Sequence, residues 1–326
     1  MINQILHGDC LELMKDIPDG SIDMVLCDLP YGTTACAWDV LIPFDLLWQA
    51  YYRVLRPNGF IVLTGSQPFT TSMIASNFEN FSHQWIWEKA QGVTPLLAKM
   101  MPMKNFEDVL VFTNPYTHDL DFKHPQRFYF EQVFKFIGRT KREIISTIGQ
   151  RADHCFRFNS TQYALCTQET YIDLIKNYRI DEMEGFTSFE ILQQQDEVFN
   201  TRYPRVYNPQ MVKGKPSKHK AKYIEHLNFT FAANENTTGL RYPTSILRFN
   251  RDASTFHPTQ KPVALFEYLL KTYTNEGMTV LDNCCGSGTT AEAAILTGRN
   301  FICMEKELKY VEISRQRVEN LKWITG

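Results

Sequence analysis

The chain has 326 residues, of which 44% are hydrophobic and 21% are charged, and its formal net charge is −2. This length and composition allow a full buried core, which excludes a disordered or fibrous protein. They fit either one large domain with an insertion or two domains.

Apolar runs are broken by charges within roughly ten residues, whereas a membrane span needs ~20 apolar residues. The start MINQILHGDC lacks the basic and then apolar pattern of a signal peptide. We therefore expect a soluble cytoplasmic protein with no membrane partner. The eight cysteines form no CxxC pair and no paired Cys/His spacing, so they predict neither a metal site nor a disulfide framework.

The first third of the chain alternates between strand and helix patterns. Strands are predicted where β-branched and aromatic residues gather, and helices where apolar residues recur at helical spacing. In chain order we expect a strand at 21–28, a helix at 44–55 that stops at the RPNG turn, and strands at 60–66, 83–90 and 106–114.

The end of the chain resumes this alternation. Here the pattern predicts a helix over 262–277 closed by Gly277, a strand over 278–282, a helix over 288–298 and a strand over 300–305. Strands separated by helices indicate an α/β fold with a mostly parallel sheet.

Residues 118–250 interrupt the alternation with polar, basic and aromatic segments, which indicates an insertion or a second lobe. Within them the run RYPRVYNPQMVKGKPSKHKAK, residues 202–222, contains no acidic residue. Such a run neutralises phosphates well, although a solvated loop would have the same composition. Its cations are Arg202, Arg205, Lys213, Lys215, Lys218, Lys220 and Lys222.

Two short motifs indicate chemistry. In VLCDLPYGTT, residues 25–34, an apolar run ends on Asp28, and Pro30 and Tyr31 follow at once. This is either a loop that turns a corner or a loop that grips a flat polar substrate.

In the terminal unit VLDNCCGSGTTAEAAILTGRNFICMEKE, a strand enters a tight turn with Gly286 and Gly288, and a helix begins there. Small residues let the backbone approach a ligand, and the helix N-terminus offers free N–H groups. Glu305 follows about 20 residues later, where an acid can bind the ribose hydroxyls of a nucleotide. The alternative is a tight turn without a ligand.

Together these motifs resemble one family, the amino-group DNA methyltransferases that carry a D-P-P-Y signature. DLPYG is similar to that signature, with Leu29 in place of its first proline, and LDNCCGSGTT is similar to the family's S-adenosylmethionine loop. Further similarity lies in HGDC, RVLRPNGFIVL, WEK, PMKNFEDVLVF and FHPTQKPVALFEYLL, the last of which resembles an H-P-T-x-K-P segment. The resemblance covers roughly 1–114 and 250–322.

The motif order, with the catalytic half first and the cofactor half last, resembles the permuted β group of this family. The resemblance implies a Rossmann-like methyltransferase sheet with helices on both faces. It also implies a catalytic half at 1–117, an inserted target-recognition region at 118–250 and a cofactor-binding half at 251–326. The basic run lies in the implied recognition region, and its Lys213, Lys215, Lys218 and Lys220 are candidate DNA contacts.

For the base, the resemblance implies that Asp28 and the carbonyl of Pro30 accept the hydrogens of the target amine, and that Tyr31 stacks on the base. The exocyclic amine is a poor nucleophile because its lone pair is delocalised, so acceptors that favour a pyramidal nitrogen would help the reaction. Asp9 is predicted either to contact the base edge or to cap the following helix.

For the cofactor, the resemblance implies that S-adenosylmethionine is held by Asp282, Gly286 and Gly288 beneath the methionine and ribose, and by Glu305 on the ribose hydroxyls. His257, Thr259 and Lys261 are expected at the methionine end, although His257 alone would also fit a structural histidine. The reaction needs no metal.

We therefore predict a DNA methyltransferase that transfers methyl from S-adenosylmethionine to N6 of a flipped-out adenine in double-stranded DNA. Methylation of the N4 of cytosine is the nearest alternative. A nucleotide-binding dehydrogenase would leave DLPYG unexplained, and a non-catalytic DNA-binding protein would explain only the basic middle. A homodimer and a cognate restriction enzyme stay open as further partners, and the recognition sequence cannot be read from this chain.

Overall fold

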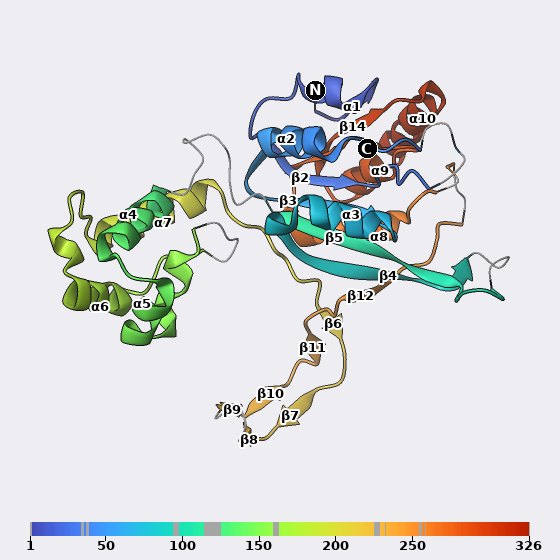
Figure 1. Ribbon diagram of the computed structural model, residues 1–326. Helices are drawn as coiled ribbons and strands as arrows, with labels where there is room; N and C mark the ends of the chain where they lie inside the picture. Colours follow the sequence, from blue (N-terminus) through green and yellow to red (C-terminus); the bar gives the residue numbers. More distant parts are fainter. Residues whose placement is uncertain are drawn as a thin grey trace.

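The computed structural model describes residues 2–33, 36, 39–93, 98–113, 125–158, 163–224, 229–231, 233–253, 256–257 and 259–325. These residues form an α/β body from which a helical lobe and a narrow β-arm project (Figure 1). The expected boundary at 117/118 lies outside the described residues. In the part of the chain that is described, no helix is long and apolar enough to cross a membrane.

The body is built on an eight-stranded sheet. β5 is antiparallel to both of its neighbours, β3 and β4, and the other neighbouring strands are parallel to each other. Across the sheet the strands are β1 (Gln4–His7), β14 (Asn300–Glu305), β13 (Thr279–Asp282), β2 (Ile22–Cys27), β3 (Leu55–Gly65), β5 (Lys104–Thr113), β4 (Phe81–Val93) and β12 (Ile246–Arg248).

This arrangement confirms the predicted mostly parallel sheet and all six predicted strands. The two ends of the chain interleave, because β13 and β14 lie between β1 and β2. The edge strands β1 and β12 were not predicted, since four and three residues give too short a pattern to read.

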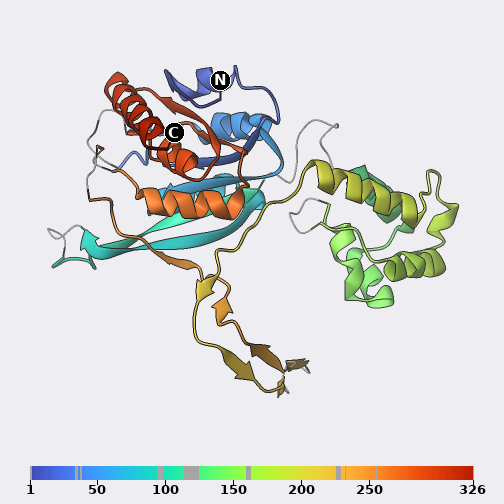
Figure 2. The same ribbon diagram turned by 180° about the vertical axis from the view of Figure 1, so that it is seen from behind.

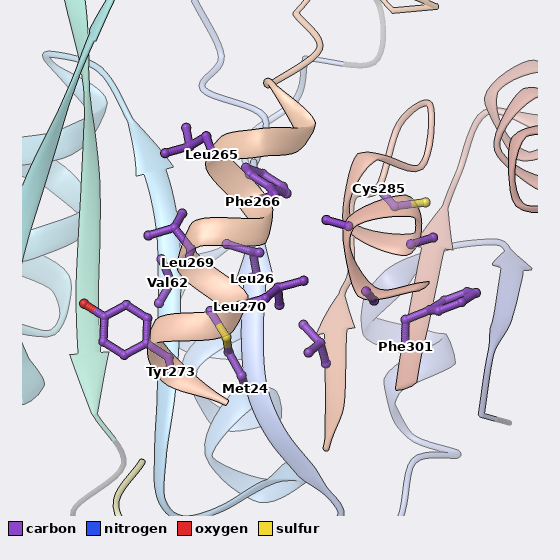
Figure 3. Close-up of a cluster of buried hydrophobic side chains, with 14 of the residues drawn as sticks. Met24, Leu26, Val62, Leu265, Phe266, Leu269, Leu270, Tyr273, Cys285 and Phe301 are labelled. Atoms are coloured by element: carbon purple, nitrogen blue, oxygen red, sulfur yellow. The ribbon is translucent and has the colours of Figure 1, made fainter. Parts of the chain in front are cut away.

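Helices cover both faces of the sheet, as expected. Successive residues of a strand point to opposite faces. In β2, Met24 and Leu26 join one buried cluster, while Val25 and Cys27 join the other. Figure 3 shows the first cluster, where Leu265 and Leu269 of α8 (Val263–Tyr273) lie over the sheet. The same face carries α9 (Thr289–Leu296) and α10 (Leu308–Thr325), and the opposite face carries α1 (Cys10–Met14), α2 (Phe44–Val54) and α3 (Phe69–Ser76).

One predicted helix end was wrong. α8 ends at Tyr273, because Thr274 is extended and both its N–H and its hydroxyl donate to the carbonyl of Leu270. Gly277 lies further on, with φ of +80°, in the turn that leads into β13.

The helical lobe has its own core and stands apart from the sheet (Figure 2). Phe130 and Val133 pack there against Ile144, Leu174 and Leu192. Its main helices are α4 (Pro125–Ile137), α5 (Lys141–Ile148), α6 (Gln168–Tyr178) and α7 (Phe189–Arg202).

The β-arm, described over residues 212–224, 229–231 and 233–241, is a two-stranded antiparallel ribbon. Three short pairings hold it together: β6 (Val212–Lys213) with β11 (Leu240–Arg241), β7 (Ser217–His219) with β10 (Asn234–Asn236), and β8 (Lys222–Ile224) with β9 (Phe229–Phe231). The region expected at 118–250 thus contains two separate units, and β12 at its end joins the central sheet.

Candidate active site

One cavity of about 450 Å³ lies at the edge of the sheet where the parallel strands end. Ligands of open α/β sheets bind at this edge. Both motif groups line the cavity although they come from opposite ends of the chain. The predicted residues among its lining are Asp9, Asp28, Pro30, Tyr31, His257, Thr259, Lys261, Asp282, Gly286 and Glu305.

Asp28 follows β2 and receives three donors. The Tyr31 hydroxyl donates to its Oδ1 at 2.8 Å, and the Thr64 hydroxyl at the end of β3 donates to the same oxygen. Lys261 Nζ donates to Oδ2 at 2.5 Å. The Asp28 side chain is 22% exposed, so it faces the cavity while these donors hold it in place.

Tyr31 is fixed at both ends of its side chain. Its ring stacks on Phe69, with centroids 4.8 Å apart and planes 26° apart, and its hydroxyl lies between Asp28 and Thr64. Burial, together with the negative charge of Asp28, raises the pKa of Tyr31 well above its usual value, so the hydroxyl stays a donor.

Asp28 and Lys261 belong to a buried row of alternating charges. Lys261 Nζ lies 3.4 Å from Glu107 Oε2, and Lys89 binds the other oxygen of Glu107. Burial disfavours the charge on Lys261, but the attraction of Asp28 and Glu107 outweighs it and raises the pKa of Lys261. Burial likewise opposes the charge on Glu107, yet Lys261 and Lys89 lower its pKa below the usual value. Both groups are therefore ionised at neutral pH.

Sequence reasoning missed Glu107, Lys89 and Thr64. Glu107 opposes Trp87 across the β4–β5 pair, and because β5 is antiparallel, its beginning lies at the edge where the other strands end. A charged residue near a strand end is typical of a solvated edge, so the sequence alone gave no reason to place Glu107 in a pocket. The one sequence feature that could have indicated a site role for Glu107 is its place in PMKNFEDVLVF, a segment that resembles the methyltransferase family.

Lys261, which was expected at the methionine end, lies beside Asp28, the residue predicted to contact the target base, because its ammonium donates to the Asp28 carboxylate. His257 and Thr259 lie nearer the glycine turn: the nearest ring atom of His257 is 3.8 Å from the Cβ position of Gly286, and the Thr259 hydroxyl is 3.0 Å from His257 Nδ1. Burial lowers the pKa of His257 below the ordinary value, so the ring is neutral at pH 7.

The glycine turn is held by two acids beneath it. The Cys284 N–H donates to Asp282 Oδ1 at 3.1 Å, and the Thr290 hydroxyl donates to Oδ2. The Gly286 N–H donates to Glu305 Oε2 at 2.9 Å. Burial raises the pKa of Glu305, which ends β14 at the cavity wall. The acids thus fix the turn as well as lining the cavity.

The two glycines have different neighbours. Gly286, with φ of +52°, lines the cavity. Gly288, with φ of +83°, packs against α10, where an added Cβ would lie 2.7 Å from Ser314 Cβ. Gly288 therefore allows close packing of the turn on α10 rather than contact with the cavity.

Asp9 is the N-cap of α1. Its side chain accepts the Leu11 N–H at 2.9 Å, which confirms the capping prediction, and it also lines the cavity. The predicted DNA-contact lysines lie elsewhere, exposed on or beside the strands of the β-arm, and Lys218 is paired with Glu235 at 2.9 Å.

The acidity of Asp282 predicts a pH effect on stability. Burial raises its pKa from 3.8 to about 7, despite the hydrogen bonds from Thr290 and Cys284. A folded-state pKa above the unfolded value means that stability is fully present below about pH 4 and is lost as the pH rises through about 7.

We expect Asp282→Asn, which cannot ionise, to be more stable than the wild type at pH 8, by up to roughly 4 kcal/mol. The difference should shrink towards pH 4. Urea unfolding at pH 4 and pH 8 measures it, and equal differences at the two pH values would contradict the buried, protonated carboxyl.

A family model described as DNA methylase matches residues 22–316. Type II methyltransferase M.HinfI of Haemophilus influenzae is 36% identical over 328 residues, which cover 98% of this chain and 69% of the relative. Type II methyltransferase M.BglI of Bacillus subtilis is 49% identical over 63 residues. That match covers 19% of this chain and 18% of the relative, so the chain spans less than a fifth of the length of M.BglI.

The fold has a counterpart among solved structures. PvuII DNA methyltransferase, described as cytosine-N4-specific, superposes with a TM-score of 0.52 at 14% identity, and the match covers 98% of this chain and 90% of that chain. This likeness concerns the fold alone. The family model and the match to M.HinfI over 98% of this chain establish that the chain belongs to the DNA methylase family of N6 and N4 methyltransferases.

Proposed function

We propose that this protein transfers a methyl group from S-adenosylmethionine to the exocyclic amine, N6, of adenine in double-stranded DNA. The observation that carries the proposal is that Asp28 shares one cavity with the Gly286 turn and Glu305, although these groups come from opposite ends of the chain. A catalyst of this reaction must bring together an acceptor for the amine hydrogens of the target base and a binding site for the nucleoside of the cofactor.

The cavity fits the cofactor in size and chemistry. Its volume of about 450 Å³ lies within the roughly 300–1,000 Å³ of small-molecule sites. Glu305 would bind the ribose hydroxyls, Gly286 would let the backbone approach, and neutral His257 with Thr259 would line the methionine end. Asp282 and Gly288 would hold the turn in place. When bound, S-adenosylmethionine supplies a methyl group on a cationic sulfur.

The base would lie against the DLPY segment. Asp28 and the carbonyl of Pro30 would accept the two amine hydrogens, which stabilises positive charge as it develops on the nitrogen. Tyr31, already supported by Phe69, offers a ring for stacking. A base in a duplex cannot reach an enclosed pocket, so we infer that the target base is flipped out of the helix.

We favour adenine over cytosine because the signature begins with Asp28, and cytosine enzymes of this family more often carry serine there. N4 methylation of cytosine is the second candidate. Incubation of unmethylated DNA with S-adenosylmethionine labelled on its methyl group, followed by nucleoside analysis, tests both. Label in N6-methyldeoxyadenosine is expected, and label in N4-methyldeoxycytidine would select the alternative.

Two candidates from other classes have separate tests. A dehydrogenase would bind NAD, and calorimetry with NAD and with S-adenosylmethionine distinguishes the two ligands. A DNA-binding protein without activity would show DNA binding and no transfer of label in the same assay.

We propose the β-arm as the main phosphate contact. A two-stranded ribbon of this kind can enter the major groove. Its lysines at 213, 215 and 220 project from the body on the exposed ribbon. By contrast, two cations of the helical lobe are paired within the lobe, Lys141 with Asp153 at 2.6 Å and Arg151 with Glu169 at 2.7 Å.

Replacement of Lys213, Lys215, Lys218 and Lys220 with glutamine should weaken binding to duplexes of every sequence, because phosphate contacts carry no base information. Each lost contact should make the slope of log affinity against log salt shallower by about 0.9. Salt titrations by fluorescence anisotropy measure this slope, and S-adenosylmethionine affinity should not change.

Lys218→Gln alone should change the slope less than Lys215→Gln, because Glu235 already neutralises Lys218. Substitution of Lys135, Arg139 and Arg142 on the helical lobe is the matched control. An unchanged slope for the β-arm variant, with a change for the control, would assign the phosphate contacts to the lobe.

We further propose that 1–117 and 251–326 act as the catalytic and cofactor halves and that 118–250 recognises the target. A cytoplasmic location, a homodimer and a restriction enzyme with the same target sequence stay predictions. Sedimentation of the purified chain tests the homodimer. Cleavage of unmethylated DNA, but not of DNA methylated by this protein, by a nuclease encoded beside its gene tests the restriction partner.

A further inference from the structure

Asp28 already has the donors that would compete with a substrate amine. Its Oδ1 accepts from two hydroxyls, those of Tyr31 and Thr64, and its Oδ2 accepts from Lys261 Nζ at 2.5 Å. An ionised carboxylate has about four acceptor positions, so these three donors leave one for an amine hydrogen. The charged donor at short distance also neutralises the carboxylate, so this donor has to move if Asp28 is to act with its full charge on an incoming amine.

Lys261 is the donor that has a second carboxylate within reach. Its Nζ lies 3.4 Å from Glu107 Oε2, a buried oxygen that has no hydrogen-bond partner among the residues that the structure describes. A shift of under about 1 Å would bring this pair to the ~2.8 Å of a charge-assisted hydrogen bond. The Tyr31 hydroxyl also has a second acceptor, Thr64 Oγ1 at 3.1 Å, but that oxygen is neutral, whereas Glu107 offers Lys261 a second carboxylate.

The buried row can accept this shift without a change in its total charge. Asp28 and Glu107 supply two negative charges, and Lys261 and Lys89 supply two positive ones. Lys261 is only 6% exposed, so its ammonium has carboxylates rather than water as partners. Glu107 is anchored by Lys89 at its other oxygen, which leaves Oε2 directed at Lys261.

We propose that Glu107 is a positioning residue that draws the Lys261 ammonium away from Asp28 when the target amine enters the site. With the base absent, Lys261 neutralises Asp28. With the base present, the amine hydrogen takes the place of the ammonium on Oδ2, and Lys261 binds Glu107 Oε2. The carboxylate then faces the developing positive charge on the amine nitrogen without a competing cation in contact.

This inference rests on the proposed function, and its test begins once the wild-type protein has been shown to methylate DNA. The target site found for the wild type is placed in a duplex, and single-turnover methyl transfer is measured at saturating S-adenosylmethionine. Absence of transfer by the wild type would overturn the proposed function itself, before any variant is compared.

The first variant is Glu107→Gln, which keeps the shape of the side chain and removes its charge. Its single-turnover rate should fall ~10–100-fold, as expected when a reacting contact is misplaced by a fraction of an ångström. The affinity for S-adenosylmethionine should change less than about twofold. Base flipping, which is measured by 2-aminopurine fluorescence, should persist. Glu88→Gln is the matched control, because Glu88 is on the same strand as Lys89 and pairs with the exposed Arg248 outside the cavity.

The second variant is Glu107→Gln combined with Lys261→Met. If Lys261 slows the single variant because it stays bound to Asp28, its removal should restore at least part of the rate. A purely structural role for the row predicts the opposite, since the double variant loses more contacts and should be slower. Either an unchanged rate for Glu107→Gln or a double variant no faster than the single one would overturn the proposal.

Glu107→Asp covers the case in which glutamine prevents folding. It keeps the charge but withdraws the carboxylate from Lys261 by one methylene. We expect a rate between those of the wild type and Glu107→Gln, and a second substitution of Lys261→Met should again raise it. A Glu107→Asp protein with the wild-type rate would count against the proposed movement of Lys261.

Discussion

Asp28→Ala is expected to lower the rate of methyl transfer about 10²–10³-fold or more, in line with the loss of one group that stabilises charge in a transition state. The physical reason is that the amine nitrogen loses the acceptor that localises its lone pair and faces its developing charge. S-adenosylmethionine affinity should change little, because the Gly286 turn and Glu305 hold each other in place through a direct hydrogen bond that does not involve Asp28. Single-turnover transfer and calorimetry measure the two quantities.

Asp28→Asn is the control for shape. The amide keeps one acceptor oxygen but carries no charge, so its rate should lie between those of the wild type and Asp28→Ala. Circular dichroism should show both variants folded, since Lys261 keeps Glu107 as a partner. A folded Asp28→Ala protein with more than a tenth of the wild-type rate would contradict the role given to this carboxylate.

Tyr31→Ala is expected to have the second largest effect, a loss of ~10–100-fold, because a base stacked on an aromatic ring gains ~1–3 kcal/mol. The sequence alone predicts that stacking needs the ring and not the hydroxyl, so that Tyr31→Ala loses far more activity than Tyr31→Phe. The structure adds the hydroxyl bond to Asp28 at 2.8 Å. The transfer rate of Tyr31→Phe should therefore also fall, by a few-fold, consistent with ~0.5–1.5 kcal/mol for one hydrogen bond.

Tyr52→Phe is the matched control. It also removes a hydroxyl in a hydrogen bond, here with Asn77 at 2.6 Å, and Tyr52 does not line the cavity. Its transfer rate should equal that of the wild type. Equal losses for Tyr31→Ala and Tyr31→Phe would mean that the hydroxyl, rather than the ring, carries the effect.

The parts of the fold that could be predicted have strong local patterns. Strand β2 is marked by the apolar run Met24–Cys27, and the glycine turn is marked by Gly286, Gly288 and a following helix. Asp28 and Glu305 could be selected because each ends a buried strand, where parallel strands place their ligand contacts. The hydrophobic pattern thus predicted both the sheet and the site residues at the ends of its parallel strands.

The parts that could not be predicted depend on pairing across the chain. Glu107 reaches the cavity only because β5 runs antiparallel, and no local pattern states the direction of a strand. The partner of Lys261 likewise lies 233 positions away in the sequence. The composition of the insertion did not predict its architecture, because the separation into a helical lobe and a β-arm depends on how each segment packs.

The most direct test of the central claim, that Asp28 and the cofactor residues form one site that methylates adenine in DNA, is single-molecule sequencing of DNA from methylation-deficient cells. Cells that express the wild-type chain are compared with cells that express Asp28→Ala and with a vector control. We predict modified adenine at one recurring sequence in the wild-type sample and at none in the other two. Modified cytosine would contradict the choice of base, and equal modification with Asp28→Ala would contradict the site.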